Sequence, residues 1–224
     1  RIDLDKNGRR DLILAEGNRL LAWRDDGQPL LRLYPYGASF AGSVRFAVGD
    51  IEGDGALEVI SAPRHGGAPV KVFDRYGNLL INNWYPVSAK FAGGLSVAIG
   101  DVSGDNKGEI IIGYGKGTTP KVAVYRLSST FQPLMVKQWL AFEKSFRGGV
   151  FVAVGNVDGA GKKEVIVGAG PGKLPLIRVY AGDGKELYQP FSAYTSLDTP
   201  GVEVAALDVN FDGKDDIAAF ASGL

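Results

Sequence analysis

The 224-residue chain lacks cysteine and has a single histidine. Without cysteine, the protein has no disulfide framework, no thiolate zinc site and no cysteine nucleophile. One histidine is too few for a histidine acid–base pair or for an imidazole-based transition-metal cluster. That residue, His65, lies between Pro63-Arg64 and two glycines, and we expect it to be a loop residue without a function of its own.

Excess charge of one sign and long apolar runs are also missing. The 25 Lys and Arg residues equal the 25 Asp and Glu residues, so no overall field would attract nucleic acid or an anionic membrane. No apolar run approaches the ~20 residues of a membrane-spanning helix. We therefore expect neither nucleic-acid binding nor membrane insertion. The chain begins without Met and inside a motif described below, so we expect a processed or trimmed start that carries no targeting information.

Glycine is abundant, with 32 residues, and the chain repeats itself. An acidic motif of nine residues begins near residues 3, 50, 101, 156 and 208, a period of about fifty residues. The five copies read D-L-D-K-N-G-R-R-D, D-I-E-G-D-G-A-L-E, D-V-S-G-D-N-K-G-E, N-V-D-G-A-G-K-K-E and D-V-N-F-D-G-K-D-D. Each copy runs directly into an apolar stretch, such as Val59–Ala62 or Val165–Gly168. A period of this length predicts a repeat architecture, with residues 1–224 as a single domain or segment.

Each full repeat contains four short segments rich in Val, Ile, Phe and Tyr and bounded by Gly, Pro, Asn or Asp, which is typical of β-strands. One of them, an alternating segment such as Phe46–Gly49 or Val152–Gly155, precedes the acidic motif. A β-sandwich also uses short strands, but it does not repeat one four-strand unit. We therefore expect an all-β fold, a β-propeller or propeller segment of four-stranded antiparallel blades with about four to five repeats.

The repeating unit resembles the FG-GAP (or VCBS) repeat of integrin α-subunit propellers and of secreted bacterial proteins. The residues G-A-G-P at Gly168–Pro171 and F-R-G-G-V at Phe146–Val150 are similar to the bacterial version. The resemblance covers essentially the whole chain. It implies a propeller located outside the cell or at the cell envelope, of the secreted bacterial kind, with adhesion-like binding. It does not imply a particular activity.

The acidic motif is a candidate calcium site. Calcium takes six to eight oxygen ligands, and positions 1, 3 and 5 can fold inward around one ion while position 9 returns a carboxylate as the next strand begins. An EF-hand would need its closing Glu at position 12, where these motifs have none. The FG-GAP resemblance implies the strand–loop–strand form of the cage. The candidate ligands are Asp3, Asp5, Asn7 and Asp11; Asp50, Glu52, Asp54 and Glu58; Asp101, Ser103, Asp105 and Glu109; and Asp208, Asn210, Asp212 and Asp216.

The five loops are not equivalent. We expect the fifth loop to be the best site and the first to follow it, whereas the second has longer Glu side chains and the third has Asn106 in place of the turn glycine. Asn156 and Ala160 replace two acids in the fourth loop. That loop keeps Asp158 and Glu164, and we expect it to be weak or empty. A plain polar turn is the alternative for any single loop, because Asp, Asn and Gly satisfy the backbone locally. The repeated clustering of carboxylates favours calcium with a structural role.

Two other patterns have structural interpretations. The glycine-rich stretches 113–119 and 168–173 superficially match phosphate loops, but each leads into another strand, so we expect hairpin turns. The three tryptophans, Trp23, Trp84 and Trp139, occur once per repeat, and we expect them to pack between blades.

For function, the leading hypothesis is a non-enzymatic, calcium-stabilised extracellular scaffold that binds protein or carbohydrate through loops on one face. The alternative is the propeller of a polysaccharide-degrading enzyme, a lyase or a glycoside hydrolase. Glycoside hydrolysis needs two carboxylates facing each other across a cleft, and Glu16, Glu143 and Glu203 are candidates outside the acidic loops that the sequence does not pair.

Three arrangements of the repeats stay open, because the first repeat lacks its opening strand and the last ends after its second strand. The last opening strand could complete the first blade and close a four-blade ring. The chain could instead be part of a larger propeller, which the resemblance to FG-GAP repeats favours. Finally, open blade edges could pair two copies of the chain.

Overall fold

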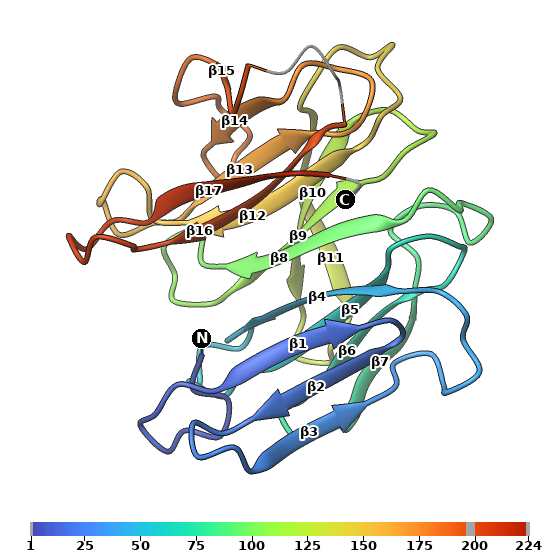
Figure 1. Ribbon diagram of the computed structural model, residues 1–224, viewed down its shortest axis with the longest axis vertical. Coiled ribbons are helices and arrows are strands. Elements are labelled where there is room, and N and C mark those ends of the chain that lie inside the picture. The colour runs from blue at the N-terminus through green and yellow to red at the C-terminus, as the bar shows by residue number, and fades with distance from the viewer. Residues whose placement is uncertain (1, 196–199, 223–224) are drawn as a thin grey trace.

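The computed structural model describes residues 2–195 and 200–222 (Figure 1). This part of the chain is built from β-strands alone, in antiparallel sheets of two to four strands. It contains no helix, and so no helix long and apolar enough to cross a membrane. The predicted all-β, antiparallel fold class is therefore confirmed.

Five sheets follow one another along the chain. The first contains β1 (Leu12–Glu16), β2 (Arg19–Trp23) and β3 (Pro29–Leu33). The second contains β4 (Val44–Gly49), β5 (Glu58–Pro63), β6 (Val70–Phe73) and β7 (Leu79–Trp84). The third contains β8 (Leu95–Gly100), β9 (Glu109–Tyr114), β10 (Lys121–Leu127) and β11 (Pro133–Leu140). The fourth contains β12 (Val150–Gly155), β13 (Glu164–Ala169), β14 (Leu176–Tyr180) and β15 (Phe191–Ser192), and the fifth contains β16 (Val202–Leu207) and β17 (Asp216–Ala221).

Each acidic loop joins an opening strand to the second strand of the same sheet. The last residue of the opening strand pairs with position 9 of the motif, as in Gly49 with Glu58 and Gly100 with Glu109. The first loop keeps only a trace of this arrangement, an isolated bridge between Ile2 and Asp11. The loops therefore occupy the same place in every repeat, and the closing carboxylate begins the strand as predicted.

The core lies between successive sheets. Four clusters of buried side chains fill the four spaces between the five sheets, and each draws residues from both neighbours. Trp84 of the second sheet packs edge-on against Tyr125 of the third, with ring centroids 4.8 Å apart. Trp139 of the third sheet lies 5.5 Å from Tyr180 of the fourth. These two tryptophans pack between sheets, as the sequence predicted. Every residue of β5, β9 and β13 is buried, because a sheet covers each face of these strands.

The opening strands lie next to one another at the centre of the molecule. β8 contacts both β4 and β12, and β12 contacts β16 (Figure 1). Glycine at the end of β4, β8 and β12 permits this approach: a Cβ on Gly49 would overlap Ile99, and a Cβ on Gly100 would overlap Val154. The spacing between neighbouring sheets therefore depends on glycines that the repeat places at one position.

The structure excludes one of the three arrangements of the repeats. Among the described residues, β16 pairs with β17 and not with β1, and the first sheet consists of three strands. The closed four-blade ring, in which the last opening strand completes the first sheet, is therefore wrong. β16 keeps β17 as its partner because these strands form a hairpin joined by their own acidic loop, which is a local pairing. The glycine-rich stretches 113–119 and 168–173 end β9 and β13 and turn into β10 and β14, as predicted.

Candidate functional site

The five acidic loops share one backbone conformation. Counting from Asp3, Asp50, Asp101, Asn156 and Asp208, positions 4 and 6 have positive φ in all five loops. Position 6 is glycine in four loops and Asn106 in the third, where φ is 65°. Position 4 is glycine in three loops, Lys6 in the first and Phe211 in the fifth, both with φ of 61°. A left-handed conformation costs a non-glycine residue about 1–2 kcal/mol, so the shared hydrogen bonds of the loop impose this shape even where glycine is missing.

Two sets of hydrogen bonds hold the shape. The side chain at position 1 accepts from backbone N–H groups at positions 4 to 6; Asp50, for example, accepts from Gly53 and Gly55, each at 2.6 Å. The carboxylate at position 9 accepts from the N–H of position 2. This second bond occurs in every loop: Leu4 to Asp11 (2.7 Å), Ile51 to Glu58 (2.9 Å), Val102 to Glu109 (3.0 Å), Val157 to Glu164 (2.8 Å) and Val209 to Asp216 (3.1 Å). The carboxylates thus have a structural use in addition to any cation.

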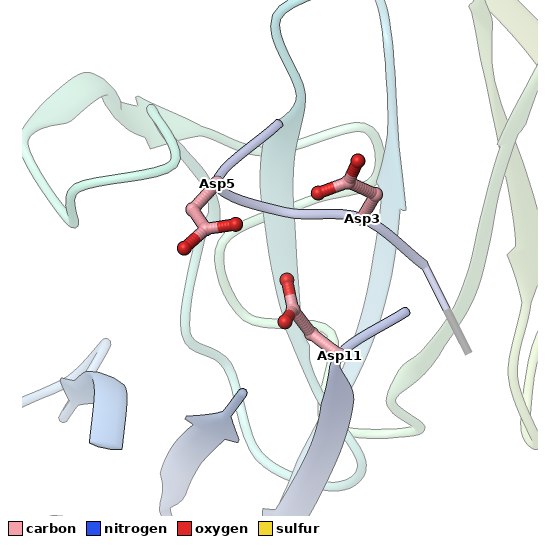
Figure 2. A group of neighbouring side chains, drawn as sticks. All are labelled: Asp3, Asp5 and Asp11. Atoms are coloured by element: carbon pink, nitrogen blue, oxygen red, sulfur yellow. The ribbon is translucent and has the colours of Figure 1, made fainter. Parts of the chain in front are cut away.

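The first loop has the geometry that best suits a cation. Asp3, Asp5 and Asp11 each place a carboxylate oxygen within 4.8 Å of the others, the only such group of three among the described residues (Figure 2). Asp11 is fully buried, and its Oδ1 has no hydrogen-bond partner. A buried carboxylate oxygen without a partner is costly unless a cation or water satisfies it. Arg24 donates to Asp5 Oδ2 at 2.8 Å and lowers the pKa of Asp5. Its guanidinium group thus supplies part of the positive charge that the three carboxylates need.

The second loop holds a buried acid, Glu58, that forms no ion pair among the described residues. Glu58 is 3% exposed. Burial raises the pKa of Glu58 to about 7, with the charges of Glu52, Asp50 and Asp54 adding to the effect and the hydrogen bond from Ile51 opposing it. At neutral pH this carboxyl is thus poorly stabilised as an anion, and a divalent cation would stabilise it.

The third loop contains an internal cation. Arg126, on β10, donates from Nε to Glu109 Oε1 at 2.7 Å and lies 3.3 Å from Asp105 Oδ2. The other Glu109 oxygen accepts from Val102 and Ser103. Two of the four candidate ligands are therefore already paired with a guanidinium group. The prediction treated this loop only as a weaker calcium site, because the arginine comes from another strand, 17 residues after Glu109.

The fourth and fifth loops are less enclosed or less acidic. Asn156 accepts from Gly159 N–H at 3.0 Å, and burial raises the pKa of Glu164. In the fifth loop, Asp208 accepts from Gly213 at 3.0 Å, and Asp216 is exposed. The structure brings the predicted ligands together most closely in the first loop and not in the fifth, which the sequence ranked highest. Metal occupancy of each loop stays a prediction.

Neighbouring acidic loops are tied to one another. In the third, fourth and fifth loops, the N–H at position 8 donates to the carbonyl oxygen at position 1 of the preceding loop. These bonds are Gly108 to Asp50 (2.8 Å), Lys163 to Asp101 (2.9 Å) and Asp215 to Asn156 (2.8 Å). A change in one loop is therefore transmitted directly to the position 1 residue of the loop before it.

A second candidate site lies where the opening strands converge. The second residue of each opening strand points to the same place: Arg45, Ser96, Phe151 and Glu203 all line two adjoining cavities of about 190 and 250 Å³. The four side chains therefore form a layer between the two cavities. The smaller cavity opens among the glycine-rich turns, and the larger one is lined by β-branched residues further along the strands.

An ion pair dominates this layer. Arg45 donates to both carboxylate oxygens of Glu203, at 2.9 and 2.8 Å, and Arg64 donates to Oε1 at 2.7 Å. The Arg45 guanidinium also lies over the Phe151 ring, 4.7 Å from its centroid. Burial acts to raise the pKa of Glu203, but the hydrogen bonds and charges of Arg45 and Arg64 outweigh it and hold that pKa below its ordinary value. Glu203 is thus an anion at neutral pH.

The rim of the smaller cavity carries further polar groups. His65 and Lys116 line it and are exposed, and Gly93, Gly94 and Gly148 form parts of its wall. Three cationic side chains and one carboxylate face this space, so its net charge is +2 with His65 neutral, whereas the whole chain is balanced. His65, expected to have no function, therefore lies at the second candidate site.

The three glutamates considered for catalysis are not brought together. Glu16 pairs with Arg19 at 2.6 Å on the surface, and Glu143 pairs with Lys173 at 2.7 Å. Only Glu203 lines the cavity. Among the described residues, the lining of the smaller cavity thus offers one carboxylate and not the facing pair that glycoside hydrolysis needs.

Sequence reasoning missed Arg45, Arg64 and Phe151. A usable signal was present, because the opening strands repeat the pattern apolar–X–apolar–Ala, and X is the position at which the repeats differ most in chemistry. Core packing does not explain a charged residue inside an otherwise apolar, repeated strand, so such a residue indicates a candidate functional position.

Comparisons with known proteins show similarity at the level of fold. No family model matches the chain, and no curated protein matches it. Among solved structures, an Agrocybe aegerita lectin that recognises non-reducing terminal N-acetylglucosamine aligns with a TM-score of 0.58 and 18% identity, over 97% of this chain and 58% of the lectin. Rhamnogalacturonan lyase YesW aligns with a TM-score of 0.54 and 19% identity, over 84% of this chain and 41% of the lyase.

The Bacillus licheniformis rhamnogalacturonan lyase PL11 gives a TM-score of 0.55 and 18% identity, over 84% of this chain and 41% of that chain. This chain spans between two fifths and three fifths of the length of these three structures. At such identity the likeness concerns the fold alone.

Proposed function

We propose that this chain is a calcium-stabilised binding module located outside the cell or at the cell envelope, and that its ligand is a carbohydrate. The observation that carries this proposal is the charged layer of Arg45, Phe151 and Glu203 beneath a cavity that opens among loops. An ion pair and an aromatic side chain at the meeting point of several sheets cost more than apolar packing would, unless they serve a ligand.

We propose further that the sheets belong to a β-propeller of the FG-GAP or VCBS type. Its support is the order of the sheets along the chain, the adjacency of the opening strands and the backbone conformation that the five acidic loops share. Among the described residues, β1 pairs only with β2 and β17 only with β16, so both ends of the array have an open edge. Further blades, or the open edge of a second copy, would cover these edges.

Calcium would act structurally in this proposal. Asp3, Asp5 and Asp11 would hold the ion in the first loop, and Glu58 with its acidic neighbours would form the second most favourable site. Bound only by the folded protein, the ion would stabilise it by mass action. The backbone hydrogen bonds that join the second to fifth loops would pass the stability from an ion in the second loop along the array. The first loop meets the second through Lys6, which donates to the carbonyl oxygen of Asp54.

Carbohydrate is favoured over protein by the similar structures. One is a lectin that recognises N-acetylglucosamine, and two are named as rhamnogalacturonan lyases. An enzyme is the second candidate function, and a lyase suits the cavity better than a hydrolase does. A lyase needs a base beside a bound, charge-neutralised substrate, and His65 and Lys116 lie on the same cavity as Arg64. A hydrolase would need a second carboxylate there.

Screening a panel of glycans and polysaccharides against the protein in calcium tests these functions together. We expect saturable binding without a change in the chain length of the saccharide. Cleavage of a bound polysaccharide, with loss on substitution of His65 or Lys116, would establish the enzyme instead. Absence of binding to every saccharide would contradict the proposal.

A further inference from the structure

The smaller central cavity differs from the rest of the protein in charge. It is lined by Arg45, Arg64 and Lys116 and by a single carboxylate, Glu203, in a chain whose total charge is balanced. The two-point pairing of Arg45 with Glu203 neutralises one of these cations. Arg64 and Lys116 therefore supply the excess positive charge.

Arg64 and Lys116 are available to a ligand. The Arg64 side chain is 43% exposed and uses one N–H, at 2.7 Å, to bind Glu203, whereas a guanidinium group has five N–H donors. Lys116 has no ion-pair partner among the described residues and is exposed at the rim. Both groups favour carboxylate or sulfate oxygens.

The size and walls of the cavity suit one sugar residue. Its volume of about 190 Å³ is below the roughly 300–1,000 Å³ of pockets for drug-sized ligands. Gly93, Gly94 and Gly148 form parts of the wall, and a Cβ on any of them would overlap the backbone of a neighbouring turn, so these glycines let the turns that frame the cavity pack closely. Phe151 and Glu203 beneath it offer an apolar face and an acceptor for hydroxyl groups.

We propose that this cavity binds one acidic sugar residue of a polysaccharide, with its carboxylate or sulfate group on Arg64 and Lys116. The inference rests on the proposed carbohydrate-binding function and names the class of its ligand. The remainder of the saccharide chain extends from the cavity across the glycine-rich turns.

Calorimetric titration with matched oligosaccharides tests the inference. The set contains a uronate oligomer, its carboxyl-reduced neutral counterpart, a sulfated oligomer and a glutamate oligomer. We expect the uronate or the sulfated oligomer to bind, the neutral one to bind at least roughly tenfold more weakly, and binding to weaken with added salt. The stronger of the two acidic oligomers identifies the anionic group.

Two variants locate the site. Lys116→Ala removes an exposed side chain without an ion-pair partner and should fold normally, and Arg64→Ala adds the loss of a hydrogen bond to Glu203. Each should weaken acidic binding by roughly 10- to 100-fold. The matched control is Lys90→Ala, which removes an exposed positive charge that lines neither central cavity and should leave binding unchanged.

The outcomes separate this inference from the function on which it rests. Equal binding of neutral and acidic oligomers, or unchanged binding by Lys116→Ala, would overturn the acidic-sugar inference and leave carbohydrate binding intact. Preference for the glutamate oligomer would overturn it in favour of an acidic peptide. Failure to bind any saccharide would overturn the proposed function itself.

Discussion

The guanidinium group of Arg45 and the carboxylate of Glu203 form a two-point ion pair at 2.9 and 2.8 Å, joining strands that lie 158 residues apart in the sequence. The pair links the second sheet to the fifth across the centre of the molecule. Their side chains are only 18% and 27% exposed, so the pair is screened less than a surface ion pair. This ion pair therefore contributes both to the stability of the folded protein and to the shape of the central cavity.

Replacing Glu203 should destabilise the protein in a pH-dependent way. Glu203→Gln leaves two arginines without their carboxylate and should lower the free energy of unfolding at neutral pH by about 1–3 kcal/mol, less than for a fully buried pair. The folded protein holds the pKa of Glu203 below its ordinary value of 4.5. The advantage of the wild type over the variant should therefore be complete above that pH and lost as the pH falls below it.

Urea unfolding of both proteins at neutral and acidic pH measures this difference. Glu143→Gln is the matched control, because Glu143 is also paired with a cation but its side chain is 52% exposed. Its cost should be below about 1 kcal/mol. An equal cost for the two variants would contradict a special role for the central pair.

Calcium should stabilise the protein chiefly through the first loop. At about a hundredfold excess over the dissociation constant, one bound ion adds about 2.7 kcal/mol, which raises the melting temperature of a domain of this size by several degrees. Asp11→Asn should remove part of that rise, because Asp11 is buried and its Oδ1 has no partner. Thermal melts with calcium and with chelator measure the effect.

The fourth loop provides the control for calcium binding. Asp158→Asn should leave the calcium-dependent rise in melting temperature unchanged, since Asn156 and Ala160 already replace two acids there. If Asp11→Asn and Asp158→Asn respond to calcium like the wild type, and elemental analysis finds no calcium, the first loop is not a metal site.

Glu58 should make the metal-free protein less stable as the pH rises. Its pKa is raised from 4.5 to about 7 in the folded state, so between these values the folded protein holds a proton that the unfolded chain has released. In chelator, the stability of the wild type relative to Glu58→Gln should fall across this window and reach its lowest value above it. Glu52→Gln, an exposed acid of the same loop, is the control. A difference that does not change with pH would contradict the assignment.

Arg126 should determine how the third loop responds to calcium. Its guanidinium group pairs with Glu109, which is 2% exposed, and with Asp105. Arg126→Gln should destabilise the protein in chelator by about 1–3 kcal/mol. It should also increase the rise in melting temperature on adding calcium, because the loop then lacks its own cation. Arg32→Gln, an exposed arginine stacked on Tyr34, should show neither effect. An unchanged calcium response in Arg126→Gln would contradict this role.

Substituting two glycines near the central cavity distinguishes the cost of backbone strain from the cost of a steric overlap. Gly94 and Gly117 both have positive φ, 74° and 97°, but a Cβ on Gly94 would overlap the carbonyl oxygen of Arg64, whereas a Cβ on Gly117 has open space. Gly117→Ala should cost about 1 kcal/mol from conformation alone. Gly94→Ala should cost clearly more and should displace Arg64. Chemical denaturation measures both, and equal costs would show that the cavity wall yields easily.

Much of the secondary structure was readable from the sequence because it depends on short-range chemistry. The acidic motif, its turn residues and the apolar segment after it fix each hairpin locally, so the start of β5 at Glu58 and of β9 at Glu109 fell where expected. The packing of Trp84 and Trp139 between sheets followed from regular spacing in the same way. Whether the ring closes could not be predicted in this way. Counting repeats does not show which strand β16 pairs with, and the structure pairs it with β17 in a hairpin.

The ranking of the loops also needed the tertiary structure. Side-chain identity favoured the fifth loop, but the burial of a site depends on its tertiary neighbours: Asp216 of the fifth loop is exposed, whereas Asp11 of the first loop is buried. The internal cation of the third loop comes from Arg126 on a separate strand.

By itself, the sequence determined that this protein consists of antiparallel strands in repeating units, each with an acidic loop at one place, because periodicity and turn chemistry act within a few residues. Only the tertiary structure decided that Arg45, Ser96, Phe151 and Glu203 meet. They occupy equivalent positions about fifty residues apart, and no local interaction links them. Side-by-side packing of the opening strands brings these residues together, and that packing depends on contacts between sheets that are far apart in the sequence.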